Sequence, residues 1–152
     1  MKLIISFIVT FTAAALGAYF TSPSINTWYA SLNKPFFNPP NWVFGPMWTL
    51  LYILMAVALY LVWKKEAESR EKLKAVILYT IQLTLNALWS VIFFGMREPT
   101  IALAEIVFLG IAVILTAQSF KKISVGASRL LIPYIIWIGF AAILNLSIVV
   151  LN

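Results

Sequence analysis

Five long apolar segments divide the chain, and nearly all of the charged residues lie in the stretches between them. The segments are residues 3–22, 43–63, 75–96, 99–120 and 130–150. Each holds about 20 residues, and at about 1.5 Å per residue an α-helix of that length spans the roughly 30 Å hydrocarbon core of a bilayer. Transmembrane β-strands are about 10 residues long and alternate in polarity, so they fit poorly. The pattern predicts an all-α integral membrane protein, a single domain over residues 1–152 built as a bundle of five transmembrane helices.

The first apolar segment has two interpretations. Lys2, the apolar run and the small residues near its end are also typical of a secretory signal peptide. The apolar core of such a peptide spans about 7–15 residues, and this run is longer. We therefore interpret residues 3–22 as a helix of the mature protein.

One connection, residues 23–42, is much longer than the others. Its prolines favour extended backbone, while Ser24 predicts a cap for a short helix over about 25–32. The loop also holds five aromatic residues, namely Trp28, Tyr29, Phe36, Phe37 and Trp42. These suit either an aromatic belt at the membrane interface or a lid over the mouth of a cavity. Because long ordered loops usually serve a function, we favour a lid.

Three of the predicted helices each carry a face that combines aromatic and polar side chains. The faces are Gln82, Asn86, Trp89 and Phe93; Trp48, Tyr52, Met55 or Ala56, and Leu59; and Trp137, Ala141, Leu144 and Asn145. Amides are costly in lipid unless they are hydrogen-bonded, so these faces should point into the bundle. Ordinary helix packing explains any one face. Three faces of this kind are more typical of a ligand cavity.

The composition agrees with a membrane protein and excludes several kinds of chemistry. Hydrophobic residues make up 62% of the chain and charged residues 11%, against about 45–50% and 25% in soluble domains. There is no Cys and no His. This excludes disulfides, thiolate nucleophiles, Cys-based metal sites and a Ser-His-Asp triad. We predict no metal site and no resident cofactor.

Basic residues predict the orientation in the membrane. Five helices place nine of the 11 Lys and Arg residues at the end of the bundle that holds the N-terminus, and two at the other end. Positive residues gather on the cytoplasmic side. We expect a bacterial-type cell membrane, and for such a membrane the charge distribution predicts that the N-terminus is in the cytoplasm and the C-terminus outside. No basic and aromatic face suits nucleic acid, so the expected contacts of the charged loops are with lipid.

Two further features are possible functional signals. Glu105 is the one carboxylate well inside an apolar segment, and charges there are functional candidates; a neutral or amide-paired glutamate is the plainer interpretation. Ala13 and Gly17, and Ala14 and Ala18, have a small-xxx-small spacing. Such spacing favours a close helix contact, either within the chain or between two chains.

Several motifs resemble the TspO/MBR family, also known as the translocator protein or peripheral benzodiazepine receptor family. The resemblance covers nearly the whole chain and every predicted helix. It rests on Trp28-Tyr29, Lys34-Pro35, Pro39-Pro40, Gly45-Pro46-x-Trp48-x-x-Leu51-Tyr52, Gln82-x-x-x-Asn86-x-x-Trp89, Phe93-Phe94-Gly95, Ala102-Leu103-Ala104-Glu105, Arg129-Leu130-Leu131-x-Pro133-Tyr134, Trp137 and Leu144-Asn145.

The resemblance implies a five-helix bundle, usually a homodimer, with a cavity under the first loop that accepts porphyrins and synthetic benzodiazepine-site ligands. The implied pocket residues are Tyr29, Pro40, Trp48, Asn86, Trp89, Trp137, Ala141 and Leu144, and the helix faces add Tyr52 and Gln82. The last segment lacks the Tyr followed by Lys or Arg of the animal cholesterol motif. Phe37 and Asn38 stand where animal forms carry Trp and His before the double proline.

Three functions follow as hypotheses. The first is a membrane receptor that binds porphyrins and other flat apolar ligands in tetrapyrrole sensing, transport or stress response. The second is an enzyme that degrades porphyrins in light, because the tryptophans linked to that chemistry in bacterial relatives match Trp48 and Trp137. The third is a small-molecule or ion transporter, for which paired charges or broken helices at mid-membrane would be expected.

Overall fold

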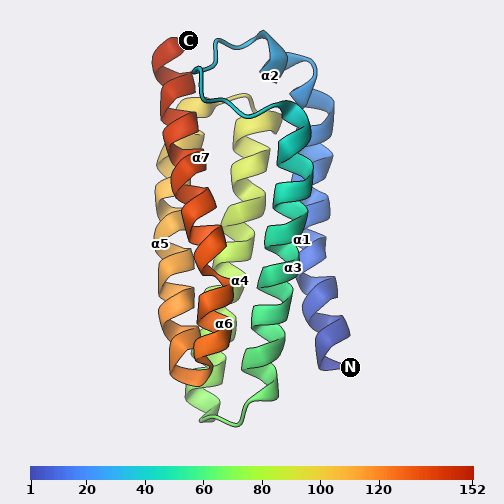
Figure 1. The fold of residues 1–152 in the computed structure, drawn as a ribbon, viewed down its shortest axis with the longest axis vertical. Coiled ribbons are helices and arrows are strands. Elements are labelled where there is room, and N and C mark those ends of the chain that lie inside the picture. The colour runs from blue at the N-terminus through green and yellow to red at the C-terminus, as the bar shows by residue number, and fades with distance from the viewer.

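The computed structural model describes residues 1–152, and all of its regular secondary structure is helical (Figure 1). Five of its helical segments are long and apolar enough to cross a membrane, which confirms the predicted fold class. The elements are α1 (Lys2–Ile25), α2 (Trp28–Ser31), α3 (Asn41–Lys64), α4 (Ser69–Ser90) with a π-helical turn η1 (Val91–Gly95), α5 (Pro99–Ile123), α6 (Val125–Leu130) and α7 (Ile132–Leu151).

The helices extend beyond the apolar segments at their polar ends. The predicted 75–96 helix begins at Ser69, because the charged residues before it are also good helix formers. The predicted 130–150 helix is preceded by α6, and Ser124 caps α6 by accepting a hydrogen bond from Ala127 N at 3.3 Å. Hydropathy detects only the part of a helix that lies in lipid, so it misses these ends.

The predicted short helix in the long loop is smaller than expected and begins later. Helix α1 continues through Pro23 to Ile25, and α2 covers only four residues. Ser24 is not its cap: the Ser24 hydroxyl donates to Phe94 O at 3.0 Å and ties the end of α1 to η1. A hydroxyl near a helix end can bond across to another element instead of capping, and sequence does not separate the two.

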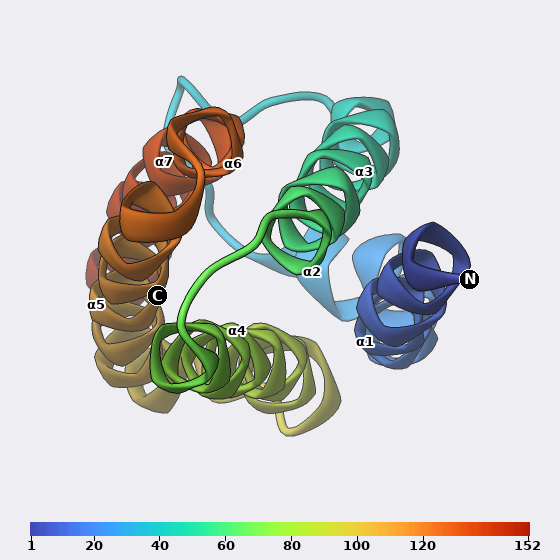
Figure 2. The same cartoon turned by 90° about the horizontal axis from the view of Figure 1, so that it is seen from below.

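The five spans form a ring. Seen from below, the order around the ring is α1, α3, α6 with α7, α5 and α4 (Figure 2). Helix α3 packs on α1 on one side and on α6 on the other, rather than along α7. Towards the end of the bundle that carries the long loop, aromatic side chains bridge α3 and α7. There Trp48 faces Trp137, with 6.4 Å between the ring centroids. Between α3 and α7, the wall of the candidate site is therefore formed by side chains and not by closely packed helix backbones.

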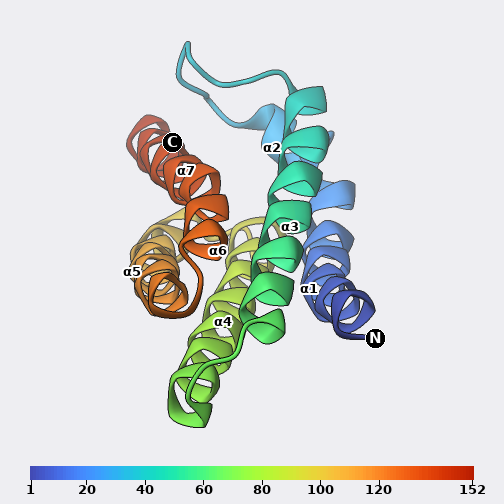
Figure 3. The ribbon, with the colours of Figure 1, turned by 60° about the horizontal axis from the view of Figure 1, so that its bottom comes forward.

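The two ends of the bundle differ in charge and in structure. The N-terminus, the 65–68 turn and the turn before α6 lie at one end, and the 26–40 segment and the C-terminus lie at the other (Figures 1 and 3). Lys2 Nζ donates to Trp63 O at 3.1 Å and joins α1 to the end of α3. The grouping of nine basic residues at one end thus follows from the observed fold.

The π-helical turn brings two consecutive phenylalanines into the bundle. Met96 N donates to Val91 O at 2.8 Å, five residues back, which widens the turn. Phe93 and Phe94 are both buried as a result. The face predicted for this helix contained only Phe93, because a regular α-helix turns its neighbour away by about 100°.

Gly95 allows α1 to approach this turn. A Cβ added there would lie 2.7 Å from Phe20 Cδ1. We expect Gly95→Ala to lower the free energy of unfolding by about 1–3 kcal/mol, because the ring must move out of a packed contact. Gly139→Ala is the matched control, since nothing lies within 4 Å of a Cβ at that position. Thermal unfolding in detergent compares the two, and equal stabilities would show that the Phe20 contact is not limiting.

Candidate functional site

A cavity of about 400 Å³ lies at the end of the bundle that carries the long loop. We call it the aromatic cavity. Helices α1, α2, α3, α4, η1 and α7 supply its wall, and α5 supplies none of it. Its lining residues are Phe11, Ala14, Gly17, Ala18, Thr21, Ser22, Ile25, Tyr29, Asn41, Trp42, Phe44, Gly45, Trp48, Thr49, Tyr52, Trp89, Ser90, Phe93, Phe94, Trp137, Phe140, Ala141, Leu144, Asn145 and Ile148.

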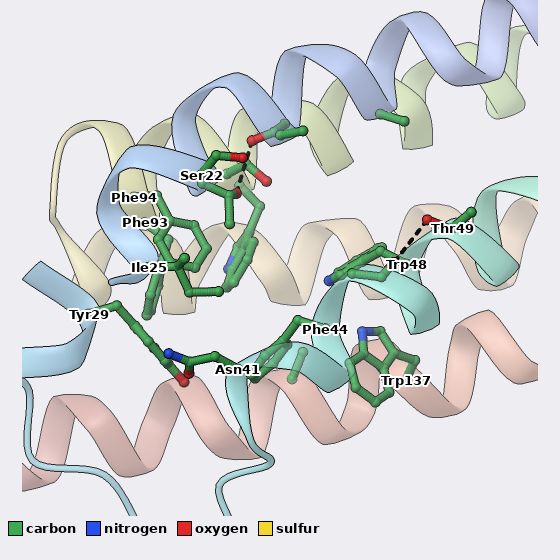
Figure 4. Close-up of a pocket in the computed structure, with 18 of the residues that line it drawn as sticks. Ser22, Ile25, Tyr29, Asn41, Phe44, Trp48, Thr49, Phe93, Phe94 and Trp137 are labelled. Carbon is green, nitrogen blue, oxygen red and sulfur yellow. Dashed lines mark hydrogen bonds between the residues drawn. The ribbon is translucent and has the colours of Figure 1, made fainter. Parts of the chain in front are cut away.

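Aromatic rings form much of this wall (Figure 4). Trp137 meets Trp48 edge-on at 88°, and Phe44 lies 6.2 Å from Trp137. On the opposite side, Trp89 stacks on Phe93 at 4.8 Å. Aromatic faces favour offset stacking and edge contacts with other flat π systems. The wall therefore suits a flat, apolar ligand.

Some of the polar groups in the cavity wall already have partners within the protein. Trp89 Nε1 donates to Asn145 Oδ1 at 3.3 Å, and Asn145 Nδ2 donates to Pro99 O at 2.8 Å. The indole Nε1 of Trp137 is different, because it is buried with no hydrogen-bond partner. A buried donor without an acceptor costs about 1–3 kcal/mol. A ligand that supplies an acceptor would recover part of this cost.

The structure brings seven of the ten predicted site residues together in this wall. They are Tyr29, Trp48, Tyr52, Trp89, Trp137, Ala141 and Leu144. The other three are not among the lining residues. Pro40 is exposed just before α3, and Gln82 is buried in the bundle with its Nε2 3.9 Å from Met55 Sδ. Whether any of the ten binds a ligand stays a prediction.

Asn86 has a different place from the predicted one. Its Oδ1 accepts a hydrogen bond from the Tyr52 hydroxyl, and its Nδ2 donates to the Tyr134 hydroxyl at 2.7 Å. Both ends of the amide are thus used within the protein, and Asn86 is 3% exposed. The prediction that Asn86 faces the inside of the bundle is confirmed. Its amide does not line the cavity, however, but lies behind it and joins α3, α4 and α7.

Several lining residues were not predicted from sequence. Seven of them belong to α1, which carries no polar and aromatic face to mark it. Its small residues were the available signal. Gly17 is buried, and a Cβ there would lie 3.2 Å from Ser90 Oγ, so this position serves a close contact between α1 and α4 within the chain.

The long loop covers the cavity with one part and exposes another. Tyr29 is buried in the wall, and its hydroxyl donates to Asn38 Oδ1 at 2.7 Å. Burial raises the pKa of Tyr29 to about 12, so this donor stays protonated at neutral pH. Phe36 is exposed, as a residue of an interfacial belt would be, and Trp42 is exposed although it also lines the cavity. The lid and the belt both stay predictions for this loop.

Two sets of polar contacts stabilise the loop. Lys34 Nζ donates to three carbonyl oxygens around α2, those of Tyr29, Ala30 and Leu32, at 2.8–3.2 Å. Asn152 joins the loop to the end of α7: its Oδ1 accepts from Asn33 N at 2.9 Å, and its Nδ2 donates to Asn33 O at 2.9 Å. The loop is thus attached to the helix that carries Trp137.

We expect Asn152→Ala to loosen this attachment. The substitution removes the side-chain acceptor of the Asn33 amide, so hydrogen exchange of that amide should accelerate at least about fivefold. Ser147→Ala is the control, because the Ser147 hydroxyl bonds only to Ile143 O within its own helix. Exchange measured by mass spectrometry over residues 31–38 checks the result. Unchanged exchange in Asn152→Ala would show that other contacts hold the loop.

Glu105 lies outside the aromatic cavity. Its side chain is 7% exposed, and neither carboxylate oxygen has a hydrogen-bond partner. The amide pairing considered from sequence is therefore absent. Glu105 does not line the cavity, so it is not part of the candidate site.

The amino-acid sequence is similar to those of known proteins. A model of the TspO/MBR family matches residues 5–151. The chain is 45% identical over 152 residues to the tryptophan-rich protein TspO of Archaeoglobus fulgidus, across 100% of this chain and 97% of that protein. It is 40% identical over 138 residues to the human translocator protein, across 88% and 82% of the two chains. It is 38% identical over 142 residues to the tryptophan-rich sensory protein of Cereibacter sphaeroides, across 91% and 87%.

Proposed function

Because this chain belongs to the TspO/MBR family, we propose that it is a membrane receptor that binds porphyrins and similar flat, apolar molecules in the aromatic cavity. The observation that carries the proposal is the wall itself: aromatic rings from six elements surround about 400 Å³, within the range of about 300–1,000 Å³ of ligand pockets. Names of relatives that refer to sensing and translocation support a receptor role.

The energetic basis of binding is stacking and burial. A macrocycle with one face on the Trp48 and Trp137 side of the wall and the other towards Trp89 buries apolar area on both faces, at about 25 cal/mol per Å². The unpartnered Trp137 Nε1 favours a ligand with a hydrogen-bond acceptor. The Phe44 and Phe140 rings pack against the Trp137 indole. These two rings therefore rotate when a ligand contacts the indole.

A titration in the dark tests the proposal. Purified protein in detergent is titrated with a metal-free porphyrin, and tryptophan fluorescence is recorded. We expect saturable quenching at one ligand per chain, because four of the six tryptophans line the cavity. Hydrogen exchange of residues 23–42 should slow when the site is filled. Quenching that does not saturate, or exchange that does not change, would contradict binding under the loop.

Porphyrin degradation in light is a second candidate, favoured by the contact of Trp48 with Trp137 in the wall. Stacking needs only an aromatic ring, whereas electron donation to an excited macrocycle needs the more oxidisable indole. We expect the double substitution Trp48→Phe and Trp137→Phe to keep most porphyrin affinity. If the chain is an enzyme, this variant should lose light-driven turnover. If the wild-type protein does not change the porphyrin spectrum in light and oxygen, degradation is excluded and the receptor function is the remaining candidate.

The orientation and assembly of the protein are also proposals. The excess of basic residues at the end with the N-terminus supports a cytoplasmic N-terminus in a bacterial-type cell membrane, with the cavity on the outer side. A reporter fused after Asn152 should then be active only outside the cytoplasm. The family resemblance supports a homodimer, which light scattering in detergent can measure.

A further inference from the structure

A second hollow lies at the opposite end of the molecule from the aromatic cavity, between α4 and α5. These helices lie side by side at one edge of the ring (Figure 2). We call the hollow the α4–α5 groove. It measures about 330 Å³ and is lined by Lys74, Leu78, Leu115, Gln118, Ser119 and Lys122. It shares no residue with the aromatic cavity.

The groove changes from polar to apolar along the membrane normal. Lys74 lies near the start of α4 and Lys122 near the end of α5, so both are at the charged end of the bundle. Leu78 is one turn deeper than Lys74, and Leu115 about two turns deeper than Lys122, or roughly 6 and 10 Å along the helices. A phospholipid has the same order, with a charged head group above acyl chains.

A buried hydroxyl in the groove has no partner. Ser119 is 4% exposed, and its Oγ makes no hydrogen bond. The nearby buried Thr116 behaves differently, because its hydroxyl donates to the carbonyl four residues earlier, as does the hydroxyl of Ser147. A buried hydroxyl without a hydrogen-bond partner is unusual, and an acceptor on a bound molecule would satisfy it. The unpartnered Ser119 hydroxyl therefore indicates that this groove binds a ligand with an oxygen acceptor.

The two lysines of the groove and the Glu71 carboxylate that pairs with Lys122 together carry one positive charge. Lys74 and Lys122 are the cations in its wall, and Glu71 faces Lys122 with 3.7 Å between Nζ and Oε1. A group with a single negative charge balances this set. Lysine ammonium groups are common phosphate ligands. The second oxygen of Glu71, Oε2, is buried without a partner and is suited to an ammonium group.

We propose that the α4–α5 groove binds the phosphodiester group of a membrane phospholipid. Lys74 and Lys122 contact the phosphate, and Ser119 and Gln118 donate hydrogen bonds to its oxygens. The acyl chains run along the apolar outer faces of the two helices, where Ile81 and Ile111 are exposed. Because nine of the 11 basic residues lie at this end, it also attracts anionic lipid in general.

Two double variants separate a built site from this general attraction. Lys74→Gln with Lys122→Gln removes both cations of the groove. Lys72→Gln with Lys121→Gln removes two charges from the same helices at the same end, but neither residue lines the groove. Native mass spectrometry of the full chain in detergent then measures binding of phosphatidylglycerol, phosphatidylethanolamine and diacylglycerol, with inorganic phosphate as a competitor.

We expect one phospholipid to bind tightly to each wild-type chain, and diacylglycerol to bind at least tenfold more weakly. The groove variant should weaken phospholipid binding about tenfold or more, and the control variant less than about threefold. Ser119→Ala should weaken phospholipid but leave diacylglycerol unchanged. Preference for either head group supports the proposal, and a preference for ethanolamine assigns its ammonium to Glu71.

Three results would overturn the proposal. Equal weakening in the two double variants would show a diffuse charge effect. Diacylglycerol binding as tight as that of phospholipid would show an apolar groove without a phosphate site. Displacement of lipid by millimolar inorganic phosphate would assign the groove to free phosphate.

Discussion

Replacing Ala141 with phenylalanine should weaken porphyrin binding at least about tenfold while the protein stays folded. Ala141 lies in the wall of the aromatic cavity beside Trp137 and Leu144. The added ring occupies roughly a quarter of the cavity, in the volume that a flat ligand would need. Overpacking of this kind costs about 1–3 kcal/mol or more, so we expect the dissociation constant to rise at least about tenfold.

The matched control for this substitution is Ile143→Phe. Ile143 is two residues further along the same helix and 58% exposed on the outer face of the bundle. It also gains a ring, but outside the cavity, so porphyrin affinity should stay within about twofold of wild type. Dark titration of all three proteins provides the comparison. Wild-type affinity in Ala141→Phe would place the ligand elsewhere on the protein.

The second large effect is on stability. Asn86→Leu should lower the free energy of unfolding by about 2–4 kcal/mol, because it leaves two buried tyrosine hydroxyls without their shared amide. Tyr52 loses its acceptor and Tyr134 loses its donor. Tyr134 is fully buried, so water cannot replace the lost contact. Thermal or denaturant unfolding in detergent measures the change.

A triple variant shows whether the loss comes from unsatisfied hydroxyls or from shape. Tyr52→Phe and Tyr134→Phe, added to Asn86→Leu, remove all three polar groups and should restore at least half of the lost stability. Thr84→Val is the control on the same helix, because the Thr84 hydroxyl is exposed and bonds only to Thr80 O. No recovery in the triple variant would assign the loss to packing.

Some features of the site were predictable because they depend on one helix at a time. The spacing of Trp48 and Tyr52 on α3, and of Trp137, Ala141 and Leu144 on α7, follows from the helical period, and all five residues line the cavity. Membrane spans were predictable for the same reason, since hydropathy is a property of neighbouring residues. Errors in helix bounds occurred where the helix leaves the apolar segment, as at Ser69.

Other features needed the arrangement of the helices in space. The face of Asn86 was predictable, but the partners of its amide were not, because they depend on how α3 and α7 approach α4. The inward turn of Phe94 depends on a π-helical turn that residue spacing does not mark. The attachment of Asn33 to Asn152 joins residues that are 119 positions apart.

Sequence patterns alone were enough to predict a five-helix membrane bundle, the inward faces of α3, α4 and α7, and the end of the bundle that carries the basic residues. These properties come from the 3.6-residue period and from the transfer of side chains between water and lipid, and both act within a single helix. The arrangement of the helices in space was needed to show that α1 completes the aromatic cavity, that Asn86 lies behind it and that Ser119 lines a groove with two lysines. Those results depend on the packing of separate helices, because the contacts of a side chain are set by the helices that surround it.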